Sequence, residues 1–119
     1  MEYAIPTVYT CIDSRAPKSQ QSMCVNIKIL GCHGSDGLLE RTSESRECST
    51  CGFLFNETLL VDAGTIARKL LFKEQLQIRH VVLSHLHFDH IQGLPTFGDN
   101  LSEQIRTPVV VASIPEVIT

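Results

Sequence analysis

The sequence predicts a single α/β domain, and three features of the chain lead to that prediction. Segments typical of strands alternate with segments typical of helices from residue 25 to residue 112. The most apolar of these segments show no alternation with polar residues, so they need cover on both faces, as layered α/β folds provide. With 119 residues, 43% of them hydrophobic, the chain is long enough to bury one core and too short for two full domains.

The first ordered segment is expected at residue 25. Residues 1–24 are mixed and polar, and we expect them to form an irregular N-terminal extension to a domain that spans residues 25–119. Residues 25–30 alternate apolar and polar side chains, which predicts a half-buried strand. Three glycines within residues 31–37 then predict a tight loop.

A hairpin and a helix are predicted next. Residues 52–55 and 58–62 are short apolar runs separated by the polar pair Asn56-Glu57, which is typical of a β-hairpin. Residues 66–77 carry apolar side chains at helical spacing, which predicts an amphipathic helix. Its apolar face would contain Ile66, Ala67, Leu70 and Leu71.

Two further strands and a helical stretch complete the pattern. Residues 78–84 are too apolar to alternate and predict a strand covered on both faces. Residues 90–105 are helical in character but interrupted by glycine and proline, and residues 108–112 predict a second buried strand. The order strand, hairpin, helix, strand, helix, strand is that of a layered α/β structure.

Charge and composition narrow the cellular setting. Ten basic and thirteen acidic residues give a net charge of −3, so no basic face indicates nucleic-acid binding. The N-terminus lacks the basic and apolar regions of a secretion signal, and no apolar run approaches the roughly 20 residues of a membrane helix. We therefore expect a cytoplasmic protein without a membrane partner.

The five cysteines do not form an obvious framework. An odd count without a secretion signal favours reduced thiols. Cys48 and Cys51 form a C-x-x-C pair, which is compatible with half of a zinc site or with redox exchange, but no second C-x-x-C follows. Incidental thiols near the end of a loop are the favoured interpretation.

The chemistry is concentrated directly after the predicted strand 78–84. Residues 85–90 read H-x-H-x-D-H, a pattern that arises by chance in roughly 4 of 10,000 sequences of this composition. Imidazole and carboxylate groups are the ligands that zinc, iron and manganese favour. The competing interpretation is that these side chains only cap a strand and a helix.

The spacing of the motif predicts two adjacent metal sites. His85 and His87, two residues apart in extended backbone, project to one side, whereas Asp89 and His90 enter a helix and diverge toward a neighbouring position. Two adjacent ions lower the pKa of bound water, hold an oxyanion and stabilise a leaving oxygen.

The H-x-H-x-D-H motif resembles the signature of the metallo-β-lactamase-fold metallohydrolases. V-D-A-G beginning at Val61 resembles the first motif of that family. D-H-I-x-G-L-P beginning at Asp89 and I-L-G-C-x-G beginning at Ile29 are similar to the branch that contains class II cyclic-nucleotide phosphodiesterases. The resemblance covers about residues 25–115.

The resemblance implies a fold and a site. The chain would be the N-terminal half of a four-layer αββα sandwich. His85 and His87 would bind one divalent ion. Asp89 and His90 would bind a second ion, and Asp89 would also be the catalytic carboxylate. These ions would be zinc, with manganese or iron as alternatives, and a hydroxide between them would attack the phosphorus of a small phosphodiester. Asp62 would orient a metal ligand from behind.

Other family features are only partly present. The resemblance puts residues 31–37 on the substrate side, with Gly34 and Ser35 as candidate contacts. No histidine follows His90, and the one later aspartate, Asp99, comes too early to be the family's bridging ligand. We therefore expect the chain to be an incomplete fragment or a truncated product that is inactive by itself.

Two other classes of function stay open. Within the same family, ribonuclease Z-like RNA processing and thioester or lactone hydrolysis share parts of the motif, although the acidic charge balance weighs against RNA. The second class is a non-catalytic module that binds metal or another protein. Such a module would expose the sheet face that meets the second half of the fold, which would invite a homodimer.

Overall fold

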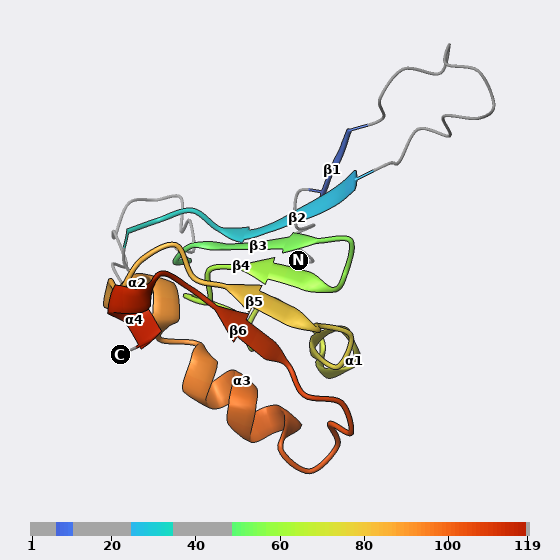
Figure 1. Cartoon of the computed structure of the whole chain (residues 1–119). Helices are drawn as coiled ribbons and strands as arrows, with labels where there is room; N and C mark the ends of the chain where they lie inside the picture. Colours follow the sequence, from blue (N-terminus) through green and yellow to red (C-terminus); the bar gives the residue numbers. More distant parts are fainter. Residues whose placement is uncertain (1–6, 11–24, 35–48, 119) are drawn as a thin grey trace, which may run out of the picture.

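The computed structural model describes residues 7–10, 25–34 and 49–118 and contains one mixed six-stranded sheet with the strands in sequence order (Figure 1). The strands are β1 (Thr7–Thr10), β2 (Val25–Gly31), β3 (Gly52–Phe55), β4 (Leu59–Val61), β5 (His80–Val82) and β6 (Val110–Ala112). The helices are α1 (Phe72–Gln75), α2 (Phe88–Ile91), α3 (Leu94–Leu101) and α4 (Pro115–Ile118). The predicted α/β class is confirmed.

The sheet changes character at β4. Strands β1 to β4 pair antiparallel with their neighbours, whereas β4, β5 and β6 pair in parallel. Parallel strands need crossover connections, and here α1 follows β4 while α2 and α3 follow β5. The broken helical stretch predicted over residues 90–105 is confirmed, since a turn at Gln92 and Gly93 separates α2 from α3.

The prediction that residues 1–24 are irregular is wrong for four of them. Thr7–Thr10 forms β1 and pairs antiparallel with β2, with Thr7 opposite Lys28 and Thr10 opposite Val25. The sequence Thr-Val-Tyr-Thr consists of residue types that favour strands, and the outer edge of β2 offers unpaired backbone groups. Residues 1–6 and 11–24 lie outside the described residues.

The predicted hairpin is confirmed as β3 and β4, with Phe53 opposite Val61 and Phe55 opposite Leu59. Asn56 and Glu57 both have positive φ, at 46° and 64°, as the tight hairpin turn that matches strand twist requires. The Asn56 side chain also accepts a hydrogen bond from the backbone N–H of Asn26 in β2, at 2.8 Å.

The predicted helix over residues 66–77 is much shorter in the structure. A single turn closes where the Leu70 N–H donates to Ile66, after which Leu71 is extended and α1 covers only Phe72–Gln75. Glu74 explains the break, because its carboxylate accepts the Leu71 backbone N–H at 2.7 Å and so begins a separate helix. Ile66 and Leu70 are buried as predicted, but Ala67 and Leu71 are exposed.

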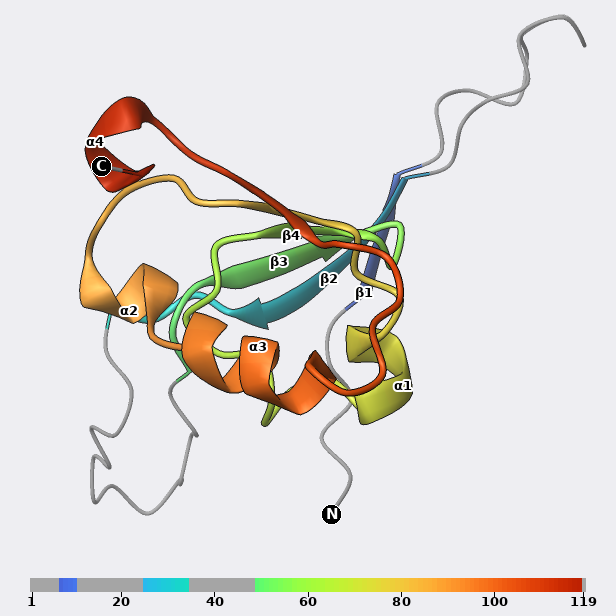
Figure 2. The same cartoon turned by 60° about the horizontal axis from the view of Figure 1, so that its bottom comes forward.

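One face of the sheet carries the core. Helices α1 and α3 lie on the same side of the sheet in both views (Figures 1 and 2). Leu54, Leu60 and Val81 point to this side from three adjacent strands and are buried against apolar side chains of the helical layer. The buried core consists of Leu30, Leu54, Leu60, Ala63, Ile66, Leu70, Ile78, Val81, Leu83, Phe97 and Leu101.

The opposite face, here named the open face, is apolar but poorly covered. Alternation along each strand and the strand register place eleven described side chains on it, none of them fully buried. They are Val25, Ile27, Ile29, Phe53, Phe55, Leu59, Val61, His80, Val82, Val110 and Ala112. The prediction that residues 78–84 and 108–112 are covered on both faces is therefore wrong, because the described part of the chain supplies a helical layer for one face only. No described helix is long and apolar enough to cross a membrane.

Candidate functional site

The candidate site lies where the parallel strands β4 and β5 end. Asp62 follows β4 directly, and the segment from Ser84 to His87 leaves the end of β5 before α2 begins. Because β4 and β5 run in the same direction, their carboxyl ends meet at one edge of the sheet, where α/β folds place their ligands.

Asp62 is the best anchored group of this edge. Its side chain is almost completely buried, and its backbone adopts φ of 60°, a left-handed conformation that aspartate tolerates better than most residues. Its carboxylate accepts the Ser84 backbone N–H on Oδ1 at 2.8 Å, the Ser84 hydroxyl on Oδ2 at 2.8 Å and His90 Nδ1 on Oδ2 at 2.9 Å. Burial raises the pKa of Asp62, but the hydrogen bonds from Ser84 and His90 outweigh it, so the pKa lies below its usual value.

The two histidines after β5 form the first close pair of donor atoms. His85 Nε2 lies 3.1 Å from His87 Nδ1, and the two rings meet edge to face. On its other side, His85 Nδ1 lies 2.8 Å from the Ser84 hydroxyl. His87 is exposed and precedes the first residue of α2.

Asp89 and His90 form the second pair, within α2. His90 Nε2 lies 3.3 Å from Asp89 Oδ2, while His90 Nδ1 is held by Asp62 from behind. The ring centroids of His85 and His90 are 3.9 Å apart, so the two pairs are adjacent. The four residues that the sequence predicts as ligands are therefore gathered in one cluster, named here the His85–His90 cluster.

Close backbone packing fixes the position of α2 under this cluster. The Ala63 N–H donates to the His90 carbonyl at 2.7 Å, and the Gly93 N–H donates to the Ala63 carbonyl at 2.8 Å. A Cβ atom on Gly64 would overlap the Asp89 carbonyl oxygen and the Thr50 hydroxyl, so only glycine allows this approach. The glycine of the V-D-A-G motif thus has a packing role.

The donor atoms suit a divalent ion, but each pair supplies only two of them. Two nitrogen ligands of one tetrahedral zinc ion are about 3.3 Å apart, given Zn–N bonds of about 2.0–2.1 Å, and the separations in the two pairs are close to that value. Within the part of the chain that the structure describes, no group of three or more His, Cys, Asp or Glu side chains is arranged to hold a metal ion. A complete coordination sphere would need further ligands.

Of the other candidate residues, Gly34 and Cys51 are described by the structure. Gly34 is exposed, with open space where a side chain would begin. Ser35 and Cys48 lie outside the described residues. Cys51 is a free thiol near the cluster, and burial, followed by the charges of Asp62, Asp89 and Cys32, raises its pKa, which disfavours the reactive thiolate.

Sequence reasoning missed Ser84. This residue touches both Asp62 and His85, yet a serine before a histidine motif carries no signal of its own. Its importance depends on Asp62, which is 22 residues away in the sequence. A hydroxyl residue at the end of the predicted strand 78–84, directly before the first histidine, is the one signal that was available.

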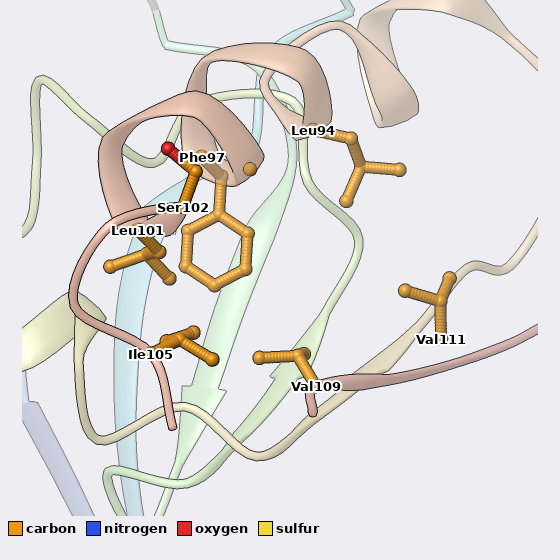
Figure 3. Close-up of a pocket in the computed structure, with 8 residues that line it drawn as sticks. Leu94, Phe97, Leu101, Ser102, Ile105, Val109 and Val111 are labelled. Atoms are coloured by element: carbon orange, nitrogen blue, oxygen red, sulfur yellow. The ribbon is translucent and has the colours of Figure 1, made fainter. Parts of the chain in front are cut away.

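A separate groove lies beside α3 and has a different character (Figure 3). It measures about 340 Å³ and is lined by apolar side chains of α3 and of the segment leading into β6, among them Leu94, Phe97, Ile105 and Val109. Ser102 contributes the one side-chain hydroxyl among the lining residues. Since the groove contains no group that exchanges protons or binds metals, the chemistry belongs to the His85–His90 cluster.

Comparison with known proteins agrees with the motif. Residues 51–113 match the family model of the metallo-beta-lactamase superfamily. The structure is similar to the metallo-beta-lactamase fold protein YhfI from Bacillus subtilis, with a TM-score of 0.58 and 23% sequence identity over 75% of this chain. The matched part spans only 37% of that protein. Among curated proteins, none matches the sequence significantly.

Proposed function

Because the chain belongs to the metallo-beta-lactamase superfamily, we propose that its His85–His90 cluster is one half of the metal centre of a metal-dependent hydrolase. The observation that carries this proposal is the pair of adjacent donor sets, His85 with His87 and Asp89 with His90, both connected to the buried carboxylate of Asp62. Three imidazoles without a ligand-binding role are rarely gathered in this way on one short segment.

Two divalent ions fit the proposed roles of these residues, with zinc favoured by the nitrogen-rich donor set and manganese or iron as alternatives. When bound, such ions supply Lewis acidity and lower the pKa of a water molecule. His85 and His87 would hold one ion, and Asp89 and His90 the other. Asp62 keeps the His90 ring in place, so that His90 Nε2 faces Asp89 rather than turning away.

For the substrate, we favour a small phosphodiester of the cyclic-nucleotide kind. The support is the I-L-G-C-x-G sequence that begins at Ile29, taken together with the D-H-I-x-G-L-P sequence that begins at Asp89, which ribonuclease Z shares in the form D-H-x-x-G-L-P. RNA processing of the ribonuclease Z type and thioester or lactone hydrolysis are the competing activities. The net charge of −3 weighs against an RNA substrate. A cytoplasmic location remains part of this proposal.

The open face supports the further proposal that residues 25–119 are half of a sandwich. An apolar sheet face of this kind is stable when a second sheet covers it, and each of the two donor pairs needs ligands from elsewhere. We propose that a second α/β half supplies both the cover and the missing ligands. A homodimer, in which a second copy covers the open face, is the alternative arrangement, and a metal-binding module without turnover is the alternative function.

Titration of the metal-free chain with Zn²⁺ tests the metal site. The chain should bind zinc, and the double substitution His85→Ala and His87→Ala should remove most of that binding. His80→Ala is the matched control, because His80 is exposed on the open face and away from the cluster. Equal zinc binding by all three proteins would contradict the ligand assignment.

The substrate class needs a separate measurement. The zinc-loaded chain should bind a cyclic nucleotide in ligand-observed NMR and show no binding of an acyl thioester. Binding of the thioester alone would overturn the phosphodiester proposal. Zinc binding without either ligand would favour the non-catalytic module.

A further inference from the structure

An unbroken series of hydrogen bonds connects Asp62 to His87 and passes through a residue that has no assigned role. The Ser84 hydroxyl lies 2.8 Å from Asp62 Oδ2 and 2.8 Å from His85 Nδ1. His85 Nε2 in turn lies 3.1 Å from His87 Nδ1. A second branch connects the same carboxylate oxygen directly to His90 Nδ1, at 2.9 Å.

Each bond in this series has only one allowed direction. An ionised carboxylate accepts hydrogen bonds and cannot donate them, so the Ser84 hydroxyl proton points to Asp62. The Ser84 oxygen can then only accept a bond from His85, which requires the His85 proton to be on Nδ1. A neutral imidazole carries one proton, so His85 Nε2 has a free lone pair and accepts the bond from His87 Nδ1.

We propose that Ser84 is a positioning residue that holds His85 as the Nδ1–H tautomer, with Nε2 free of its proton. His90 also carries its proton on Nδ1, because Nδ1 donates directly to Asp62, so one buried carboxylate fixes the Nδ1 proton of a histidine in each donor pair. The consequence for metal binding rests on the proposed function, because the nitrogen left free is the one that the ligand assignment uses. The tautomer itself does not depend on it.

The two branches differ in their protection from water. His90 and Asp62 are largely buried, with side-chain exposures of 14% and 6%, so little water competes for their bond. Ser84 is exposed, and water is the competitor for its hydroxyl. The Ser84 backbone N–H, which also donates to Asp62, keeps the residue in register even when its hydroxyl is removed. Ser84→Ala should therefore affect the His85 tautomer without releasing the strand end.

Histidine tautomers of the metal-free full chain can be measured by long-range ¹H–¹⁵N NMR at about pH 8, where an unperturbed imidazole is neutral. We expect Nδ1–H signals for His85 and His90 in the wild type. In Ser84→Ala, His85 should shift toward the Nε2–H form while His90 is unchanged. Ser84→Thr, which keeps a hydroxyl at this position, should show the wild-type signals. Ser102→Ala is the control, because its hydroxyl donates to the Asp99 carbonyl, outside the cluster.

A wild-type His85 protonated on Nε2, or a His85 signal that Ser84→Ala leaves unchanged, would overturn the proposal. Zinc titration separates it from the proposed function. Loss of a partner that orients a metal-bound histidine typically lowers metal affinity 10- to 100-fold, so Ser84→Ala should weaken zinc binding by about that factor. A changed tautomer in a chain whose wild type binds no zinc would refute the metal centre and leave the role of Ser84 intact. Tautomers that Ser84→Ala leaves unchanged, together with normal zinc binding, would refute the role of Ser84 and leave the metal centre intact.

Discussion

The two faces of the sheet have nearly the same sequence character but different surroundings. Within β5, Val81 is completely buried against the helical layer, whereas its neighbour Val82, on the open face, is 38% exposed. In β6, Val110 on the open face is 53% exposed. The open face therefore leaves apolar side chains accessible to water at strand positions whose neighbours on the helical side are buried.

The largest effect is expected from substitutions that compare these faces within one strand. Val81→Ala should lower the free energy of unfolding by about 2–3 kcal/mol, because it removes buried methyl groups and leaves a cavity. Val82→Ala removes the same atoms from the open face and should change the free energy of unfolding by less than about 1 kcal/mol. Urea denaturation of both variants measures the difference.

Equal losses in the two variants would mean that the open face is already covered in solution, by a second copy of the chain. Repeating the urea denaturation at several protein concentrations identifies that case, since the stability of a dimer rises with concentration.

An intermediate change in the free energy of unfolding is expected at acid pH. It involves Glu74 on the helical side of the sheet and Asp62 at the candidate site. Burial raises the pKa of Glu74, but the hydrogen bonds from Lys28 and from the Leu71 N–H outweigh burial, so the pKa lies below its usual value. The pKa of Asp62 is likewise lowered by its hydrogen bonds. A lowered pKa in the folded state gives stability that is present above the unfolded value of about 4 and is lost as the pH falls through the folded value. Stability should therefore decline below about pH 4.

Urea midpoints measured down the acid range test this prediction. Glu74→Gln should flatten the decline, because the variant has no carboxylate to protonate at the Lys28 contact that connects α1 to β2. Val82→Ala should follow the wild-type pH profile, since the open face contributes no described carboxylate. An unchanged acid profile in Glu74→Gln would contradict the role of this ion pair.

The smallest change in stability is expected on the open face itself. Val110→Ser should alter the free energy of unfolding by less than about 1 kcal/mol, because the side chain is already half exposed. The same substitution should lower the fluorescence of the dye ANS, which reports accessible apolar surface. Unchanged ANS fluorescence in Val110→Ser would show that the open face is not accessible.

The order of the elements was predictable because it follows from local periodicity. The alternation of residues 25–30 and the Asn56-Glu57 pair each determine their element without distant contacts. The predictions that were wrong depend on distant or competing groups. The helix over residues 66–77 was shortened by the Glu74 carboxylate, and the cover of residues 78–84 depends on layers that local sequence does not describe.

The candidate site was predictable to the extent that it is contiguous. Four of its side chains lie within residues 85–90, and their spacing alone indicates two pairs. Asp62 required the resemblance to a family, and Ser84 could be recognised only from coordinates. Its hydroxyl matters because the parallel pairing of β4 with β5 brings Asp62 beside it.

That parallel pairing also determines when the site can form. The β3–β4 hairpin closes a turn of three residues, whereas β5 can join β4 only after the eighteen residues between Val61 and His80 have been looped out. Short loops close faster than long ones, so we expect the hairpin to form early and the contact between Asp62 and Ser84 to form late in folding. An ion that binds the finished cluster should then slow unfolding and leave the folding rate unchanged, as stopped-flow measurements with and without zinc would reveal. A bound metal ion would thus stabilise the folded state kinetically, by slowing the unfolding of a sheet that has already assembled.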